Sequence, residues 1–344
     1  MGKATGALLV GSVNLPTGDD VFRTASRILG QHLAAVPDGE TGDRNNWIGW
    51  QMPALAAVDG IDFGAPITNP GSYEPFPQLV LTKPAAEIRL SNLGYADAAI
   101  ASYRRFTELR ASGAVPAGVR FQVALPTPLA VVNSWVALAD RDAFEPVYTA
   151  AILAEHDAIA RSIPVADLVI QWDIAIEIGI LEGAFLARPR HDYCGIVERI
   201  RAFAERSADA GAAVGLHLCY GDYQHSHFKE PETLALCVRL ANDVAKVRDR
   251  RWLDYVHMPV PPGGEAAYFE PLAGLSEAAG TLFLGVVHDP SRTAEAEDRR
   301  LVELAERCSP RAFGVATECG MGRVPQPEIE PLLARHAALA QPVR

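Results

Sequence analysis

The chain has 344 residues, 49% of them hydrophobic, which is enough apolar material for a large core. Its formal net charge of −11, with no basic run or aromatic-basic stripe, argues against nucleic acid as a partner. The start resembles no signal peptide, no stretch approaches the roughly 20 apolar residues that span a bilayer, and the cysteines are too few for a disulfide framework. We therefore expect a cytoplasmic protein with reduced thiols and no membrane partner.

Short apolar runs rich in β-formers alternate with helix-like stretches along the chain. The predicted strands are Leu8–Val13, Gln78–Thr82, Val119–Leu125, Asp167–Asp173, Ala213–Cys219, Leu253–Met258, Thr281–Val287 and Phe313–Thr317. The predicted helices are Asp19–Ala35, Tyr95–Ser112, Asp142–Ser162, Gly195–Ala210, Pro231–Val247, Glu265–Ala278, Arg292–Cys308 and Pro327–Leu339. Several strands are nearly continuous runs of Val, Leu, Ile and Phe, which is typical of parallel strands buried on both faces.

This alternation predicts an α/β fold, a (β/α)8 TIM barrel formed by one domain over residues 1–344. The rival is an open doubly wound sheet, which would normally carry a glycine-rich phosphate loop after its first strand. Residues 11–16 form no such loop. The barrel is therefore the preferred interpretation.

A long insertion, residues 36–77, separates the first predicted helix from the second predicted strand and is rich in Gly, Pro, Asp and Trp. Connections of this length are usually functional, so we expect a lid. Glu40 and Arg44 in this segment are candidates for substrate binding, with Arg44 clamping an anionic group. The alternative is a turn held together by its own Asp/Arg pairs.

Catalytic groups of such barrels lie at the C-terminal ends of the strands. The side chains found at or just after the predicted strand ends are Ser12, Asn14, Lys83, Thr127, Asp173, His217, Cys219, His257, His288, Glu318 and Cys319. Ser12, Asn14 and Lys83 are candidates for substrate binding. The other three cysteines fall on predicted helices, where a buried cysteine is merely a small apolar residue.

The sequence places three potential metal ligands at these ends. His217 and Cys219 point to the same face of a strand because side chains alternate along it, and Cys319 arrives from another strand end. Two thiolates and an imidazole suit a zinc ion with an open position. The alternative is a pair of core cysteines. His257 ends the next strand and is either the fourth ligand or an active-site hydrogen bonder, whereas His225 and His227 are expected to be loop residues.

Two further strand ends indicate acid–base chemistry. His288 could protonate a leaving group because its ordinary pKa is near neutrality, or it could fix the following turn through Asp289. Asp173 ends an apolar strand, where a carboxylate is costly unless it is paired or functional. We expect substrate binding there, with a structural salt bridge as the alternative.

Five short motifs match those of one known family in order along the chain. They are Gly11-Ser12 followed by Pro16, Val169–Asp173, His217–Tyr220, Gly285–Arg292 and Glu318–Gly320, and they look like the family's Ile-Gly-Ser-Phe-Pro, Gln-x-Asp-Glu-Pro, His-Met-Cys-Tyr, Gly-Val-x-x-x-His-Ser-Pro-Arg and Asp-Cys-Gly. On these motifs the chain resembles the catalytic C-terminal domain of cobalamin-independent methionine synthase, in the superfamily that also holds uroporphyrinogen decarboxylase.

The resemblance implies roles for these residues. His217, Cys219 and Cys319 would bind Zn2+, which lowers the pKa of a substrate thiol so that the thiolate is present at neutral pH. The thiolate would attack an electrophilic alkyl carbon, and His288 would deliver a proton to the departing group. Ser12 and Asp173 would bind the polar end of the thiol.

Two departures from the family pattern suggest a different substrate. The family's fourth ligand is a glutamate, and the corresponding stretch, Tyr255–Met258, offers His257 instead. The family's second strand is followed by His-Gly-Glu, whose glutamate holds an ammonium group. Here Thr82–Ala85 follows the predicted second strand, so Lys83 stands near the place of that carboxylate. Lys83 and Arg44 would suit an anionic substrate group.

The predicted function is a zinc-dependent methyl or alkyl transferase that uses a small-molecule thiol and an alkyl donor. One alternative is a zinc-dependent lyase or decarboxylase of the same superfamily that acts on a small anionic substrate. Another is a zinc-storing or interaction protein, against which the full set of polar strand ends argues. The sequence leaves open the two substrates and the oligomeric state, a homo-oligomer included.

Overall fold

Eight parallel strands form one curled sheet in the computed structural model, which describes residues 2–67, 76–222, 226–246 and 252–343. The strands are β1 Ala4–Ala7, β2 Ala35–Pro37, β5 Arg120–Pro126, β6 Leu168–Ile174, β7 Ala213–Leu218, β8 Tyr255–Pro259, β9 Thr281–Gly285 and β10 Phe313–Val315. They are hydrogen-bonded in the order β1-β10-β9-β8-β7-β6-β5-β2. A parallel bridge between Ala7 and Leu33 joins the two ends of this sheet. The predicted TIM-barrel fold is confirmed.

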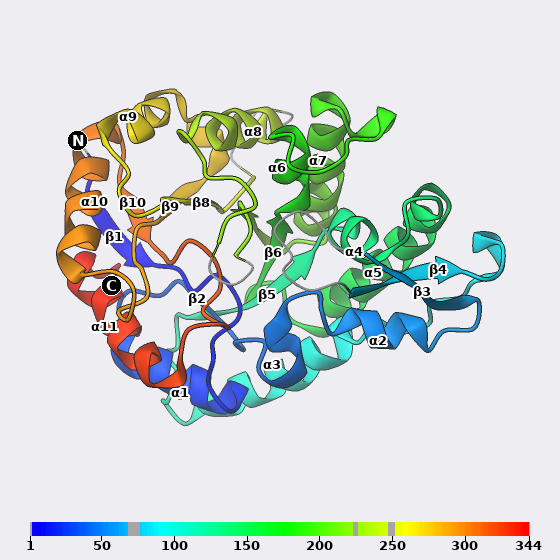
Figure 1. Cartoon of the computed structure of the whole chain (residues 1–344). Coiled ribbons are helices and arrows are strands. Elements are labelled where there is room, and N and C mark those ends of the chain that lie inside the picture. Colours follow the sequence, from blue (N-terminus) through cyan, green and yellow to red (C-terminus); the bar gives the residue numbers. More distant parts are fainter. Residues whose placement is uncertain (1, 68–75, 223–225, 247–251, 344) are drawn as a thin grey trace.

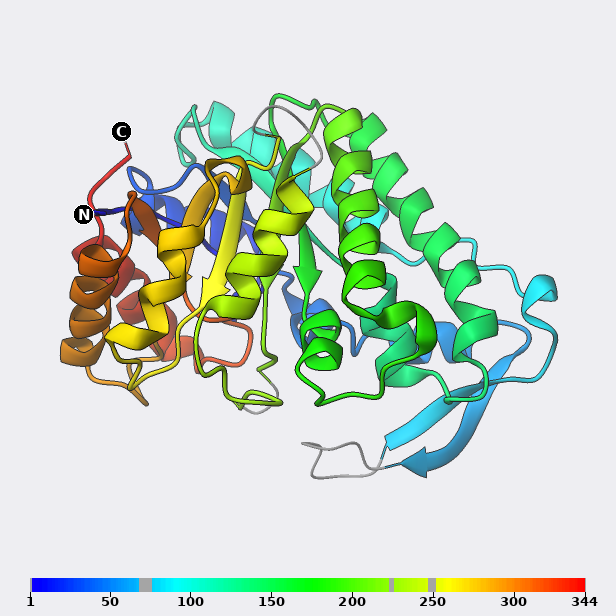
Figure 2. The ribbon, with the colours of Figure 1, turned by 90° about the horizontal axis from the view of Figure 1, so that it is seen from above.

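Helices cover the outside of the sheet, as Figures 1 and 2 show. Those that follow the strands are α1 Gly18–Leu29, α3 Tyr95–Ala111, α5 Arg141–Ser162, α7 Tyr193–Asp209, α8 Ala235–Ala245, α9 Ala266–Phe269, α10 Glu295–Cys308 and α11 Ile329–Leu339. The predicted helix Glu265–Ala278 is instead α9 followed by two 3-10 turns, Glu270–Gly274 and Glu277–Ala279. Among the described residues, no helix combines the length and apolarity needed to cross a membrane.

The start of α1 illustrates how local sequence sets these helices. The Thr17 hydroxyl accepts a hydrogen bond from the backbone N–H of Asp20 at 3.2 Å, which caps the helix. Asp19 and Asp20 place negative charge at the positive end of the helix dipole. Val21 and Leu29 are fully buried against the sheet, so capping and an apolar stripe act together.

The predicted second strand is wrong. Gln78–Thr82 falls mostly in β4 (Phe76–Leu81), which pairs antiparallel with β3 (Ile61–Ile67) in a hairpin outside the barrel. The true second strand, β2, has three residues and lies where the predicted helix Asp19–Ala35 meets the predicted insertion 36–77. A strand this short carries no sequence periodicity, and it exists because β5 pairs with it.

This correction moves the insertion. The insertion was predicted to come before the second strand of the barrel, but it follows that strand, β2. It therefore begins at the end of the barrel where the C-terminal strand ends meet. It holds a 3-10 turn, η1 (Gly42–Asn46), then α2 (Gln51–Ala56) and the β3–β4 hairpin. Of the predicted 36–77 segment, residues 68–75 lie outside the described part. Two further short helices, α4 (Pro128–Trp135) and α6 (Ile176–Leu181), follow β5 and β6 at the same end.

The first strand begins earlier than predicted, and the stretch after it is held by side chains. β1 ends at Ala7, whereas the predicted strand begins at Leu8. The Gln122 amide donates to the Leu9 carbonyl at 2.9 Å, and the Gln171 amide donates to the Val10 carbonyl at 2.7 Å. These bonds satisfy buried carbonyls that no neighbouring strand reaches. A separate cluster of buried apolar side chains packs together, with members Leu8, Val10, Ala35, Val169, Ala213, Tyr255, Phe283 and Ala316.

Candidate metal centre and active site

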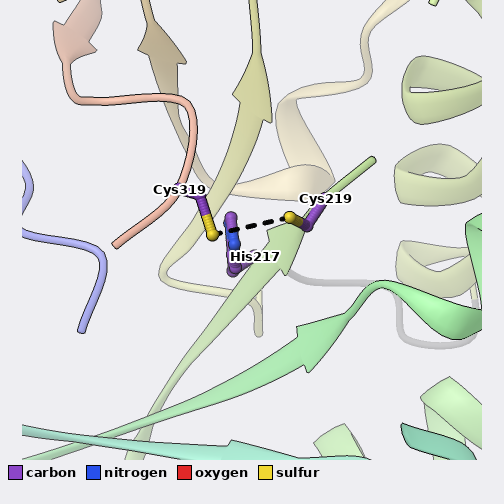
Figure 3. Close-up of side chains that lie close together, drawn as sticks. All are labelled: His217, Cys219 and Cys319. Atoms are coloured by element: carbon purple, nitrogen blue, oxygen red, sulfur yellow. Dashed lines mark hydrogen bonds between the residues drawn. The ribbon is translucent and has the colours of Figure 1, made fainter. Parts of the chain in front are cut away.

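Three of the predicted metal ligands come together at the barrel mouth. His217 lies on β7, Cys219 directly follows that strand, and Cys319 follows β10; Figure 3 shows the two sulfurs facing each other beside the imidazole. One ligand atom from each residue lies within 4.8 Å of the others. All three strand ends are therefore placed as the sequence predicts.

The spacing of the two sulfur atoms fits a shared metal ion. Cys219 Sγ and Cys319 Sγ are 3.7 Å apart. Two thiolates bound tetrahedrally to one zinc ion at ~2.3 Å would be roughly 3.8 Å apart, whereas a disulfide bond is ~2.05 Å long. A hydrogen bond with Cys219 and burial raise the pKa of the Cys319 thiol well above its ordinary value. Two thiolates this close together and this deeply buried would repel each other, and a cation bound to both would offset that repulsion.

A hydrogen-bonded chain decides which nitrogen of His217 is free. His257 Nε2 lies 3.0 Å from the Thr317 carbonyl, which can only accept, so that nitrogen carries the proton. Burial lowers the pKa of His257 to about 3, so the ring is neutral and its Nδ1 is an acceptor. His217 Nδ1 lies 2.7 Å from it and must donate. His217 Nε2 therefore keeps its lone pair, as a metal ligand needs.

His257 itself lies outside the group of three potential ligands. Both of its ring nitrogens are engaged, one with His217 and one with Thr317. Of the two roles that the sequence left open, the hydrogen bonder fits this geometry and the fourth ligand does not.

Two carboxylates lie together near this centre, Asp173 on β6 and Glu40 just after β2. Burial raises the pKa of Asp173 to about 7, although hydrogen bonds from Gln171 at 2.9 Å and from the Trp47 indole at 3.1 Å oppose this. Burial and the charges of Asp173 and Asp38 raise the pKa of Glu40 well above its ordinary value. A pair held this way has a strong electrostatic preference for a cation between or beside its members.

The backbone around Glu40 is strained. Glu40 and Trp47 have backbone φ angles of 47° and 44°, a region that residues other than glycine rarely adopt. Gly39 has φ 78°, and a Cβ there would lie 2.6 Å from Val21 Cγ2, so glycine is required. Strain concentrated on the residues that present a carboxylate and an indole to one site is typical of a functional loop.

The corrected second strand changes the comparison with the methionine synthase pattern. β2 is followed by Asp38-Gly39-Glu40, which occupies the place of the family's His-Gly-Glu. In this alignment of the motifs, Glu40 stands where the family has its glutamate, a counterpart that the sequence interpretation took to be missing. Lys83 is not near it: this side chain lies on the surface, 2.5 Å from the exposed Asp59 carboxylate.

Arg44 adopts the alternative that the sequence left open. Its guanidinium donates to Asp38 Oδ2 at 2.7 Å, and Asp38 also accepts from the Ser102 hydroxyl at 2.6 Å. The loop is thus held by its own Asp/Arg pair. Of the other predicted substrate-binding residues, Ser12 lines the cavity, whereas Asn14 donates to the Val324 carbonyl at 2.8 Å and is structural.

His288 does not line the cavity. Its Nδ1 lies 2.7 Å from Asp298 Oδ1 and its Nε2 lies 2.9 Å from the Val260 carbonyl. Burial alone would lower the pKa of His288, but the Asp298 hydrogen bond and the Glu318 and Asp298 charges raise it above its ordinary value. Direct protonation of a leaving group by His288 does not fit this placement.

The sequence interpretation missed His227, which does line the cavity. His227 Nε2 lies 3.5 Å from Glu318 Oε1, and His288 Nε2 lies 3.6 Å from Glu318 Oε2. Glu318 therefore stands between the cavity histidine and the buried one. The sequence placed His227 in a loop but could not show that it faces the cavity, because that position depends on tertiary contacts such as the one with Glu318. His225 lies outside the described residues.

The cavity above these groups has a volume of about 760 Å³. Its polar part includes Ser12, Glu40, Asp173, His217, Cys219, Asp222, His227, Cys319 and Arg323. Its apolar part includes Trp47, Ile48, Met52, Phe76, Trp135, Ile176, Phe185, Leu186 and Phe228. The insertion after β2 supplies members of both parts. That it acts as a lid stays a prediction.

Comparison with known proteins supports the fold. No sequence-family profile matches the chain, and no curated protein sequence matches it. Among solved structures, a methyltransferase from Methanosarcina mazei is similar, with a TM-score of 0.55 and 14% identity over 98% of this chain and 94% of that one. A D-psicose 3-epimerase matches less well, with a TM-score of 0.39 and 12% identity over 71% of this chain and 82% of that one. At these identities the likeness concerns the fold.

Proposed function

We propose that this protein is a zinc-dependent methyl or alkyl transferase that acts on a thiol. The observation that carries the proposal is the donor set: two sulfur atoms 3.7 Å apart and an imidazole nitrogen whose lone pair is kept free by the His257 chain. His217, Cys219 and Cys319 would hold the ion. When bound, zinc would lower the pKa of a substrate thiol so that the thiolate is present at neutral pH.

The carboxylates beside this centre support an amino-bearing thiol. Glu40 and Asp173 would bind its ammonium group, and the Trp47 indole would keep Asp173 in position. This replaces the anionic substrate group that the sequence suggested, because Lys83 and Arg44 are paired elsewhere. An ammonium group would also favour ionisation of the two carboxylates.

For the leaving group, the cavity residue nearest to the buried acid–base groups is His227. We assign the proton donation to His227, with Glu318 behind it and with His288 and Asp298 behind Glu318. His288 then acts through other groups. The Methanosarcina mazei neighbour is a methyltransferase, which makes methyl our choice among alkyl groups.

Zinc analysis and X-ray absorption would test the proposal. We expect about one zinc per chain in the unaltered protein, little in Cys219→Ala or Cys319→Ala, and full zinc in the control Cys194→Ala, whose exposed thiol is far from the cavity residues. Adding homocysteine should add one sulfur neighbour at the zinc absorption edge.

Two results would contradict the proposal. Full zinc in both cysteine variants would remove the metal site. Zinc without a new sulfur neighbour, with any of several thiols, would remove thiol activation and favour the lyase or decarboxylase alternative.

A further inference from the structure

A buried arginine lies on the cavity wall away from the metal centre. Arg141 is the first residue of α5, is only 8% exposed and lines the cavity. Its Nε donates to the Val136 carbonyl at 2.8 Å, and one terminal nitrogen donates to Asn133 Oδ1 at 3.0 Å. Both partners are neutral. Within the described part of the chain, no ion pair to Arg141 and no partner of its other terminal nitrogen is found.

The position of Arg141 is unfavourable for a cation in three ways. The side chain is buried, Arg188 lies close enough to act on its charge, and both effects lower its pKa. It also stands at the N-terminus of a 22-residue helix, where the dipole favours anions. The acidic neighbours are engaged elsewhere, because Asp140 accepts from the Leu81 amide at 3.0 Å and Asp142 pairs with Arg188.

An uncompensated charge in such a place needs a counter-ion from outside the protein. Two neutral acceptors hold the Arg141 guanidinium, and its remaining terminal nitrogen is suited to donate to an oxyanion. The planar guanidinium can also bind two oxygens of such an anion side by side. The structure already fixes the guanidinium through Asn133 and Val136, so little side-chain entropy would be lost when an anion binds.

The cavity wall that surrounds this site is apolar and partly aromatic. Phe76 and Trp135 meet edge to face, with ring centroids 5.2 Å apart, and the Trp135 indole donates to the Ile48 carbonyl at 3.1 Å. Leu186 lines the same cavity although 60% of its surface is exposed. Fixed aromatic faces and an exposed leucine in the same cavity as a charge suit a ligand with a planar apolar body.

The charges of the cavity also fix a direction. Glu40 follows β2 and Asp173 lies on β6, close to the metal centre. Arg141 begins α5, after β5 and α4, and lines another part of the cavity. An anionic group would find no counter-charge at Glu40 and Asp173, and it would be attracted by Arg141. A ligand with both features would therefore place its oxyanion at Arg141 and its other end toward His217, Cys219 and Cys319.

We propose that the alkyl donor is a planar, apolar molecule with a carboxylate or similar oxyanion, and that Arg141 binds this oxyanion. That this ligand is the alkyl donor rests on the proposed function, whereas the existence of the oxyanion subsite does not. Glu40 and Asp173 are assigned to the thiol, so the apolar part of the cavity is left for the second substrate.

Calorimetric titration of the metal-free, thiol-free protein tests the subsite. The probes are 2-naphthoate and its neutral match, 2-naphthamide, which share a planar body. The unaltered protein should bind the naphthoate more tightly, and Arg141→Met should weaken naphthoate binding about 10- to 100-fold. Binding of the naphthamide should change less than about twofold. Arg141→Lys, which keeps the charge without the planar fork, should give an intermediate loss.

The thermal midpoint of Arg141→Met should equal or exceed that of the unaltered protein, because the substitution removes an unpaired buried charge. Equal affinities of the two probes for the unaltered protein would overturn the proposal, and so would equal losses in Arg141→Met or no binding of either probe. Because zinc and thiol are absent from this titration, its failure leaves the metal centre untouched. Failure of zinc binding likewise leaves this result intact.

Discussion

Replacing His257 by leucine removes the acceptor that orients His217 without touching a proposed ligand. In the structure, His217 Nδ1 lies 2.7 Å from His257 Nδ1, and His257 Nε2 is held 3.0 Å from the Thr317 carbonyl. Loss of such an outer hydrogen bond typically weakens metal binding 10- to 100-fold, which corresponds to about 1.4–2.7 kcal/mol. We therefore expect His257→Leu to bind zinc one to two orders of magnitude more weakly than the unaltered protein.

Competition with a chromophoric chelator measures this zinc affinity directly. His257→Gln is the matched control, because its amide oxygen can accept from His217 while its amide N–H donates to Thr317, so most of the affinity should return. Cys219→Ala should lose far more than either variant. An unchanged zinc affinity in His257→Leu would refute the relay. A loss as large as that of Cys219→Ala would mean that His257 is itself a ligand.

Three further outcomes follow from the site geometry. Because burial raises the pKa of Asp173 from 3.8 to about 7, the folded ligand-free protein loses stability as pH rises through that interval. Asp173→Asn should remove this loss and be the more stable form at pH 8 in urea unfolding. A less stable variant would contradict this prediction. Trp47→Phe removes the 3.1 Å indole bond that lowers the pKa of Asp173, so the pH midpoint of homocysteine binding should move upward; no shift would count against the bond. Lys83→Ala breaks only an exposed ion pair and should cost at most about 1 kcal/mol, with homocysteine binding unchanged; weaker binding would place Lys83 at the site after all.

The metal triad illustrates what a sequence can predict. His217 and Cys219 share a face because side chains alternate along a strand, which is a local rule. Parallel strand ends converge at one end of a barrel, which is a general rule of the fold. The structure places Cys319 with them as the sequence predicts. The identity of the ion stays a prediction.

The second strand illustrates the opposite case. Three residues, Ala35–Pro37, carry no periodicity, and the longer apolar run Gln78–Thr82 looks more like a strand. Its place in the barrel depends on pairing with β5, which is a contact between segments distant in sequence. This one error hid the correspondence between Asp38-Gly39-Glu40 and the family's His-Gly-Glu, and it made Lys83 look important.

The sequence by itself determined the barrel, the positions of the triad and the polar character of the strand ends, because hydrophobic periodicity and strand alternation are local properties. Only the tertiary structure decided that His257 orients His217, that Glu40 joins Asp173 and that His227 and not His288 faces the cavity. It also showed that Arg141 has no anionic partner among the residues that the structure describes. These depend on which way a ring or a guanidinium points and on what is packed beside it. Packing between distant segments sets both, and no local pattern records them.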